Sequence, residues 1–216
     1  TANLGWGYKE VKRELEELTG LEAHIGNDAN VAALGEMFQG AGKGYKNLIM
    51  VTLGTGVGGG IIINGKLLKG KSGAAGEMHF ALSRHSKRAC TCGAYDCFEA
   101  YASGNGLRQT GIEIFNDEDI TTYDIVEKAK NNNPKAIQTL EIWQNDIALG
   151  VLGLLNIFDC DCVVLSGSME KFVDTKKIEE FVNKKTVTTP TKIYHAKASN
   201  NSGMIGAVLL GFDLIN

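Results

Sequence analysis

Residues 79–99 read HFALSRHSKRACTCGAYDCFE and contain one histidine followed by three closely spaced cysteines. Cys90, Cys92 and Cys97 fall within eight residues, and His79 lies eleven positions before Cys90. One imidazole and three thiolates form a complete tetrahedral ligand set for Zn²⁺, as in closed structural sites. The segment is a polar loop with too few apolar residues to pack on its own, so a metal would hold it. The alternative is three core or loop cysteines without a metal, two of them joined in a disulfide.

Composition limits the class of protein. At 216 residues the chain can hold one large domain or two small ones, and either can bury a core. The net charge of −3 is spread in mixed sign, which argues against nucleic acid or an anionic membrane as a partner. We find no apolar run of about eighteen residues and no basic-then-apolar leader, so we expect no membrane span and a cytoplasmic location. The five cysteines fit a reducing compartment better than a disulfide scaffold.

Helical and strand patterns alternate along the chain, which favours an α/β fold. We expect helices at 8–19, 29–38, 98–110, 120–130, 134–158, 169–184 and 201–214, and strands at 21–25, 47–52, 61–63, 66–68, 161–165 and 192–195. Asn64-Gly65 between two apolar runs predicts a hairpin turn of type I′. Cys160 and Cys162 have no ligand partners nearby in sequence, and we interpret them as small core residues.

Two short segments are candidates for chemistry. Asn27-Asp28 directly precedes a predicted helix, so either residue could simply be its N-cap. The segment LGTGVGGG at 53–60 joins two predicted strands and opens no helix, so it is neither a Walker loop nor a dinucleotide fingerprint. Its glycines let backbone N–H groups approach an anion, and Thr52 and Thr55 add hydroxyl donors. The alternative is a plain glycine-rich turn.

Three ordered motifs together resemble the ROK family of bacterial sugar kinases and repressors. They are GNDANVAALGE at 26–36, LGTGVGGGIIINGKL at 53–67, and the H-x₁₀-CxCGxxDCxE pattern of 79–99 followed by AYASG. The resemblance implies a two-lobed, actin-like ATPase fold of the ribonuclease H-like type and ATP-dependent phosphorylation of a hexose. It implies that residues 1–26 are the remainder of an N-terminal lobe, 27–200 the larger lobe with the zinc loop, and 201–216 a C-terminal helix returning toward the N-terminal lobe.

The resemblance also implies roles for individual residues. Asp28 resembles the general base that takes the proton from the sugar hydroxyl. The sugar-binding set would be Asn27, Glu77, His79 and Glu99, with His79 also a zinc ligand beside Cys90, Cys92 and Cys97. ATP with Mg²⁺ would be held by Thr52, Gly54, Thr55, Gly56, Gly58 and Gly59 of the second phosphate motif, and by Gly167 and Gly203 near the adenosine.

The sequence departs from the family pattern in three places. Glu77-Met78-His79 is one residue shorter than the usual Glu-x-Gly-His, and Asp96 replaces the usual glycine before the third cysteine. Asp96 either adds an acceptor near the sugar or caps the loop. The Asp-x-Gly-x-Thr phosphate motif, with which the family begins, is absent. We therefore expect a chain that corresponds to the C-terminal two-thirds of a kinase and that has little or no kinase activity alone.

Three functions remain in competition at this point. The first is a glucokinase-like hexose kinase, the second is a sugar-sensing transcriptional regulator, and the third is a zinc-stabilised remnant without catalysis. The hexose is not identified by the motifs. Because relatives in this family usually pair through the large lobe, we also expect a homodimer.

Overall fold

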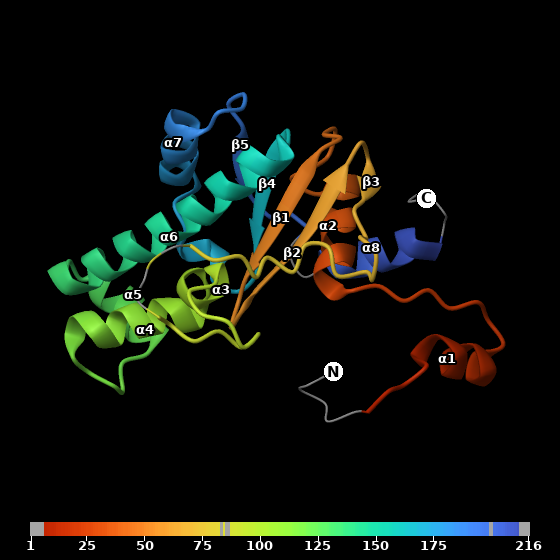
Figure 1. Ribbon diagram of the computed structural model, residues 1–216, viewed down its shortest axis with the longest axis horizontal. Coiled ribbons are helices and arrows are strands. Elements are labelled where there is room, and N and C mark those ends of the chain that lie inside the picture. Colours follow the sequence, from red (N-terminus) through yellow and green to blue (C-terminus); the bar gives the residue numbers. More distant parts are fainter. Residues whose placement is uncertain (1–6, 83, 85–86, 199–200, 212–216) are drawn as a thin grey trace.

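The computed structural model describes residues 7–82, 84, 87–198 and 201–211, and these form a three-layer α/β/α arrangement around one sheet (Figure 1). The sheet has the order β3-β2-β1-β4-β5. Its strands are β1 (Leu48–Leu53), β2 (Val57–Ile63), β3 (Lys66–Leu67), β4 (Cys162–Ser166) and β5 (Lys192–His195). Strands β1, β4 and β5 are parallel, and the hairpin of β2 and β3 is added to β1 in antiparallel pairing.

The helices divide between the two faces of the sheet. Helices α2 (Asp28–Gln39) and α8 (Asn201–Gly211) pack together on one face. The other face carries α3 (Phe98–Ala102) and the long α6 (Pro134–Phe158). Helices α4 (Gly104–Phe115), α5 (Thr122–Lys130) and α7 (Thr175–Lys185) pack on α6. Helix α1 (Val11–Thr19) has no buried residue and lies beside the main body (Figure 1).

The two cores follow from the alternation of side chains along β1. Leu48 and Met50 point to one face and pack with Leu34 of α2, while Ile49 and Val51 point to the other, where the core contains Trp143. All of these side chains are fully buried. A strand covered on both faces reads as a continuous apolar run, which is how β1 was recognisable in sequence.

The predicted hairpin between β2 and β3 is confirmed. Asn64 and Gly65 have φ values of 53° and 75°, the left-handed conformation that a type I′ turn needs at both central positions. Ile63 then pairs with Lys66. The helix predicted at 134–158 and the strand predicted at 192–195 also have the expected limits.

Three predicted elements are wrong. The segment 21–25 forms no strand. The single helix expected over 98–110 is two helices, because Ser103 adopts an extended conformation and caps α4 by accepting from the Gly106 N–H at 3.0 Å. The break lets the Gly104 N–H donate to the Gly54 carbonyl in the hairpin loop at 2.8 Å.

The helix expected over 169–184 is also divided. A short 3₁₀ turn (Glu170–Phe172) follows β4, and α7 begins only after Asp174, whose side chain accepts from the N–H groups of Lys176 and Lys177. Asp174 is a common N-cap residue type, and it was the missed start signal. The last helix is described to Gly211, and the predicted continuation to 214 lies outside the described residues.

Some large apolar side chains of the helices are exposed. Phe38 of α2 is 54% exposed, and Ile157 of α6 is 73% exposed. Cys160 and Cys162 are buried as predicted, and burial raises the pKa of each thiol to about 12. Across the described residues, no helix is both long and apolar enough to cross a membrane.

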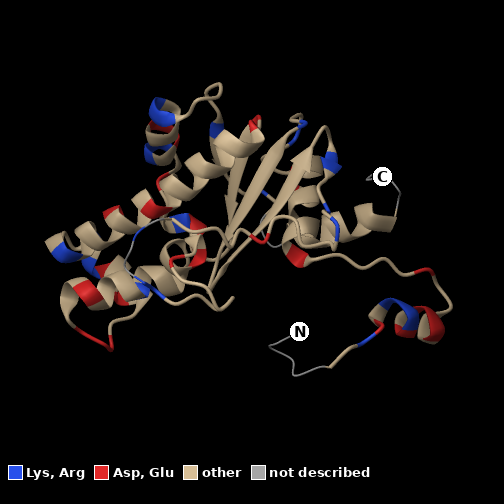
Figure 2. Cartoon of the chain, in the orientation of Figure 1, with Lys and Arg blue, Asp and Glu red and all other residues tan. Residues whose placement is uncertain are grey.

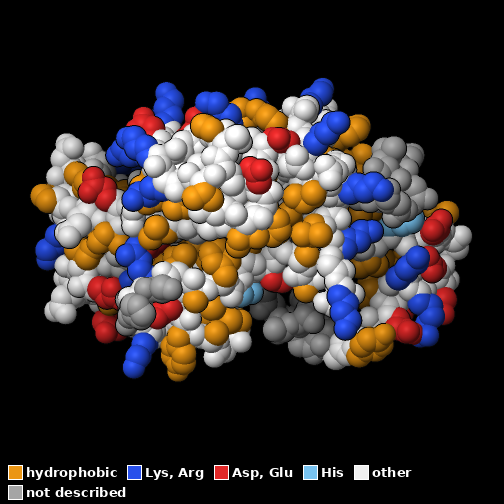
Figure 3. Space-filling model, turned by 45° about the horizontal axis from the view of Figure 1, so that its top comes forward, with side chains coloured by type: hydrophobic (Ala, Val, Ile, Leu, Met, Phe, Trp, Pro, Cys, Tyr) orange, Lys and Arg blue, Asp and Glu red, His pale blue; other side chains and the backbone are white. Residues whose placement is uncertain are grey.

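Charged side chains of both signs are interspersed on the outer helices, including α1 and α7 (Figure 2). Figure 3 shows a face on which apolar groups are scattered among polar and charged ones and which is hollowed near its lower middle.

Candidate functional site

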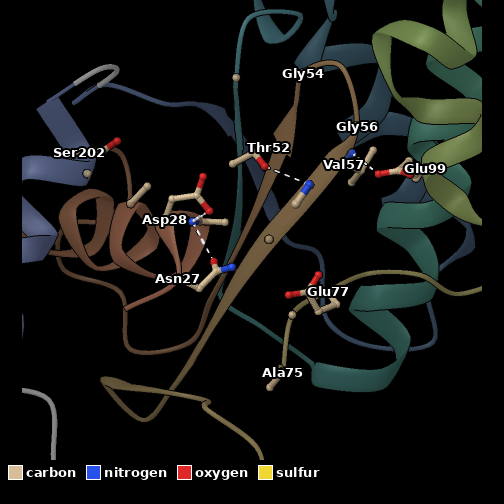
Figure 4. A pocket seen from close by; sticks show the side chains of 17 residues that line it. Asn27, Asp28, Thr52, Gly54, Gly56, Val57, Ala75, Glu77, Glu99 and Ser202 are labelled. Carbon is tan, nitrogen blue, oxygen red and sulfur yellow. Dashed lines mark hydrogen bonds between the residues drawn. The ribbon is translucent and has the colours of Figure 1, made fainter. Parts of the chain in front are cut away.

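A cavity of about 560 Å³ opens where six segments of the chain meet (Figure 4). The start of α2, the β1–β2 hairpin, residues 75–77, α3, the turn after β4 and the start of α8 all contribute to its wall. Its lining contains eleven of the residues singled out in sequence: Asn27, Asp28, Thr52, Gly54, Gly56, Gly58, Gly59, Glu77, Glu99, Gly167 and Gly203. The tertiary structure therefore gathers residues that are spread over more than 170 positions in the chain.

The structure separates the roles of Asn27 and Asp28. Asn27 is the N-cap of α2, and its Oδ1 accepts from the N–H groups of Ala29 at 3.0 Å and Asn30 at 3.1 Å. Asp28 is the first residue of the helix, exposed at the cavity wall, and accepts only a local bond from the Ala29 N–H at 2.9 Å. The capping requirement is thus met by Asn27, and Asp28 is available for another role.

Three carboxylates surround the cavity from different segments. Figure 4 shows Asp28 on one side, Glu99 on the opposite side and Glu77 between them below the sheet. One oxygen of Glu99 accepts from the Val57 N–H at 3.0 Å, and the other accepts from the Thr91 hydroxyl at 2.7 Å. Burial alone would raise the pKa of Glu99, but the hydrogen bonds from Thr91, Val57 and Cys90, together with the nearby His79, outweigh burial, so the pKa lies below its usual value.

The glycine run of the hairpin lets the backbone of β2 lie close to α2, and two of its N–H groups already donate within the hairpin. A Cβ on Gly60 would lie 2.6 Å from the Ala33 Cβ, so only glycine lets α2 approach β2 this closely. The N–H of Gly54 already donates to the Gly56 carbonyl at 3.0 Å, and that of Gly58 to the Thr52 hydroxyl at 3.1 Å. These two N–H groups are therefore occupied within the hairpin.

His79, Cys90, Cys92 and Cys97 form a cluster whose ligand atoms all lie within 4.8 Å of one another. The Cys90 Sγ to His79 Nδ1 distance is 3.6 Å, and the Cys92 Sγ to Cys97 Sγ distance is 3.5 Å. A tetrahedral zinc centre with ordinary bond lengths has S···N and S···S edges of about 3.6 and 3.8 Å. The four residues therefore fit Zn²⁺, and all five cysteines are free thiols in the structure.

The loop that carries these ligands also contacts the helical layer through two arginines. Arg84 pairs with Asp146, a nearly fully buried residue of α6. The guanidinium of Arg88 lies 4.6 Å from the ring centroid of Tyr101 and donates to Glu113 of α4 at 2.8 Å. Two arginines therefore connect this loop to the helical layer through charged contacts.

Asp96 acts within this loop and does not line the cavity. Its φ is 56°, a left-handed conformation that aspartate tolerates better than most residues. Its carboxylate accepts from the N–H groups of Lys87 at 3.1 Å and Arg88 at 2.9 Å, and from the Tyr101 hydroxyl. Of the two roles left open by the sequence, the structure supports holding the loop.

Met78 shows how the shortened segment before His79 is accommodated. Its φ is 49°, and its side chain is buried against β2, where a Cβ on Gly59 would lie 2.1 Å from the Met78 Cε. Gly59 thus makes room for Met78, and the packing places Glu77 at the cavity.

Two predicted site residues lie elsewhere. His79 and Thr55 line an adjoining groove and are not in the lining of the first cavity. Sequence reasoning also missed Ser202, which lies in that lining at the start of α8. Helix α8 approaches α2 closely at Gly35, where a Cβ would lie 2.0 Å from the Ser202 carbonyl oxygen. A contact between two helices so far apart in the chain cannot be recognised from a single sequence, so no sequence signal marked Ser202.

Comparison with known proteins finds sugar kinases and a sugar-responsive repressor among the relatives of this chain. The chain is 33% identical to a glucokinase of Halalkalibacterium halodurans over 94% of this chain and 68% of that protein. It is 33% identical to an N-acetylmannosamine kinase of Escherichia coli, covering 99% of this chain and 73% of the relative. A xylose repressor of Bacillus subtilis is 32% identical over 78% of this chain and 44% of its own length.

Solved structures of similar proteins are also sugar kinases of one family. A ROK hexokinase from Thermus thermophilus superposes with a TM-score of 0.83 at 28% identity, covering 93% of this chain and 68% of that one. A ROK glucokinase from Streptomyces griseus, solved with glucose and AMPPNP, gives a TM-score of 0.78 at 28% identity, covering 95% and 73%. The model of the ROK family matches residues 1–213. With its motifs gathered around one cavity on an actin-like ATPase fold, this chain belongs to the ROK family.

Proposed function

We propose that the protein phosphorylates a hexose at the expense of ATP, with Asp28 as the general base. The observation that carries this proposal is the position of Asp28 in the cavity wall, opposite Glu99, while Asn27 alone caps the helix. A carboxylate that is exposed to a cavity and not needed for capping can accept a proton from a bound hydroxyl.

In the proposed reaction a sugar hydroxyl oxygen forms a bond to the γ-phosphorus of ATP as the bond from that phosphorus to ADP breaks. The hydroxyl proton passes to Asp28. Phosphoryl transfer depends mainly on positioning and charge stabilisation, so one well-placed carboxylate is sufficient as a base. Asn27, Glu77 and Glu99 are proposed to hold the other hydroxyls, and the amide nitrogen of Asn27 faces the cavity in Figure 4.

The nucleotide is proposed to bind in the same cavity. Gly54, Gly56, Gly167 and Gly203 line the same cavity and leave room for phosphates close to the backbone. ATP would enter with Mg²⁺, which neutralises phosphate charge. The Streptomyces griseus relative, whose solved complex contains AMPPNP, supports a nucleotide at this kind of site.

Zinc is proposed to have a structural role beside the sugar. Burial raises the pKa of the Cys97 thiol to about 12, so that thiol is protonated unless a metal is bound. The metal would hold Thr91, which donates to Glu99, in the loop that carries its ligands.

The test is a phosphorylation assay of the full-length gene product with ATP and glucose, mannose, fructose, N-acetylglucosamine and N-acetylmannosamine. Formation of ADP that depends on one of these sugars, and is lost in Asp28→Asn, is expected. Absence of turnover with every sugar, from protein that contains zinc and is folded, would refute a kinase.

A second candidate is a sugar-sensing regulator, favoured by the similarity to the Bacillus subtilis xylose repressor. Such a protein would bind sugar at the same cavity without transferring phosphate. Sugar binding by calorimetry combined with no ADP formation would favour this function.

A further inference from the structure

A fully buried carboxylate on α2 has no role in the proposed transfer. Glu36, in the last turn of the helix, has no exposed surface, and no ion pair within the described residues involves it. Because a buried carboxylate is costly without hydrogen bonds, its partners matter. They are the backbone N–H groups of Ala41 at 2.8 Å, Lys197 at 3.1 Å and Ala198 at 2.8 Å. Gly40 leaves space for this group, since a Cβ there would lie 2.0 Å from the Glu36 Oε2.

Two of the three donors belong to a segment that leads into α8. They lie 161 and 162 residues from Glu36 in the chain, so the carboxylate joins α2 to a distant part of the sequence. The Ala198 carbonyl in turn accepts from the N–H of Asn201, the first residue of α8, at 2.9 Å. The next two residues of α8, Ser202 and Gly203, line the first cavity. Glu36 therefore holds the chain just before it reaches the cavity wall.

Glycines allow α2 and α8 to touch, but they do not orient the two helices. A Cβ on Gly35 would lie 2.0 Å from the Ser202 carbonyl oxygen, and a Cβ on Gly206 would lie 1.7 Å from the Val31 carbonyl oxygen. Close packing of this kind sets the separation of two backbones. Hydrogen bonds are directional as well, so the three that Glu36 accepts also constrain how the start of α8 is oriented on α2.

Helices α2 and α8 carry different parts of the proposed function, on which this inference rests. Asp28, the proposed base, is the first residue of α2, and Gly203 of α8 belongs to the wall proposed for the nucleotide. Figure 4 shows Ser202 of α8 on the same side of the cavity as Asp28. We propose that Glu36 is a positioning residue, which fixes the start of α8 relative to Asp28 and so places the nucleotide within reach of the sugar hydroxyl. Its loss should impair use of the nucleotide more than binding of the sugar, because the residues proposed to hold the sugar lie outside α8.

The main variant is Glu36→Gln in the full-length gene product. Glutamine keeps the shape, but its NH₂ group cannot accept, so at least one of the three N–H groups loses its acceptor. Gly40→Ala is the second variant, which keeps the charge and displaces the carboxylate. The matched control is Glu179→Gln, because Glu179 also accepts from a backbone N–H, that of Ile193 at 3.0 Å, but lines none of the described cavities. Circular dichroism shows which variants are folded.

Initial rates of ADP formation are measured with ATP and the sugar varied in turn, and calorimetry measures the binding of AMPPNP and of the sugar. Glu36→Gln is expected to raise the KM for ATP and the Kd of AMPPNP about tenfold, the effect of one lost hydrogen bond, and to change the KM for the sugar by no more than about twofold. Gly40→Ala should change the same constants in the same direction. Glu179→Gln should leave both KM values unchanged.

Three results would overturn the positioning role and leave the kinase proposal intact. They are equal changes in the two KM values or none, the same change in Glu179→Gln, and failure of both the Glu36 and the Gly40 variant to fold, which would show that the carboxylate serves the fold as a whole. Absence of sugar-dependent ADP formation by the unsubstituted protein would refute the kinase proposal, and AMPPNP calorimetry would still test Glu36. Absence of AMPPNP binding as well would overturn both.

Discussion

Asp28→Asn is the substitution that most sharply separates catalysis from folding in this protein. In the structure the Asp28 carboxylate makes one local bond, to the Ala29 N–H, and an asparagine Oδ1 can accept the same bond. The cap of α2 is supplied by Asn27 and is untouched. We therefore expect the free energy of unfolding to change by no more than about 0.5 kcal/mol, as for most exposed substitutions.

The catalytic loss should be much larger. An amide cannot take the hydroxyl proton, and general-base catalysis contributes about 10²–10⁴-fold, or about 3–5 kcal/mol of transition-state stabilisation. Asn27→Ala provides the contrast, because it removes two capping bonds. It should lower the free energy of unfolding by about 1 kcal/mol and the melting temperature by about 2–4 °C.

The assay is coupled detection of ADP from the full-length gene product, with urea unfolding and sugar calorimetry on the same preparations. The expected pattern for Asp28→Asn is near-normal stability, near-normal sugar affinity and lost turnover. Turnover within about threefold of the unsubstituted protein, well short of the effect of a lost general base, would refute the assignment of Asp28 as the base. Lost turnover accompanied by a large fall in stability would show that the residue acts through the fold.

Four further predictions follow from the same contacts. Elemental analysis of protein purified without chelator should find one zinc per chain, and Cys92→Ser should release it; absence of zinc in the unsubstituted protein would contradict the site. Asp96→Gly relieves the left-handed backbone but removes the acceptor for two N–H groups and the Tyr101 hydroxyl, so urea unfolding should show a net loss of about 1–3 kcal/mol. Burial raises the pKa of Glu179, but the hydrogen bonds that it accepts from the Lys192 ammonium and the Ile193 N–H lower the pKa by more than burial raises it. The pKa of Glu179 in the folded protein therefore lies below the unfolded value. The ionised Glu179 therefore contributes to the free energy of unfolding above a pH of about 4.3, and this contribution is lost as the pH falls through the folded pKa. Urea unfolding should show Glu179→Gln to be less stable than the unsubstituted protein at pH 7, and the difference should disappear in acid. Light scattering at micromolar concentration should give the mass of a homodimer, and a monomer would count against the predicted pairing.

Local features of the sequence were sufficient for much of the fold. The helix over 134–158 has proline at its first position and the asparagine cap Asn133 before it, both of which act within one turn. The hairpin at Asn64-Gly65 depends on two residues that tolerate positive φ. The zinc-ligand set was visible because three of its four members lie within eight residues.

Other features needed the tertiary structure because their causes lie far away in the chain. The helix after Phe98 breaks at Ser103, where the Gly104 N–H reaches the hairpin loop fifty residues earlier. The segment 21–25 has the residue types of a strand but no neighbouring strand to pair with in the described structure. A strand is stabilised by its partners, so its own residues do not determine it.

The candidate site shows the same division between local and distant causes. The sequence by itself determined which residue types are present: the Asn27-Asp28 pair, the glycine run and the Cys/His cluster. Only the tertiary structure decided which of Asn27 and Asp28 caps α2, and that Asp96 holds the loop instead of facing the cavity. The donors, which are the N–H groups of Ala29, Asn30, Lys87 and Arg88, lie close in sequence to the oxygens that accept from them. Whether they come within about 3 Å depends on the backbone conformation that packing against distant segments imposes.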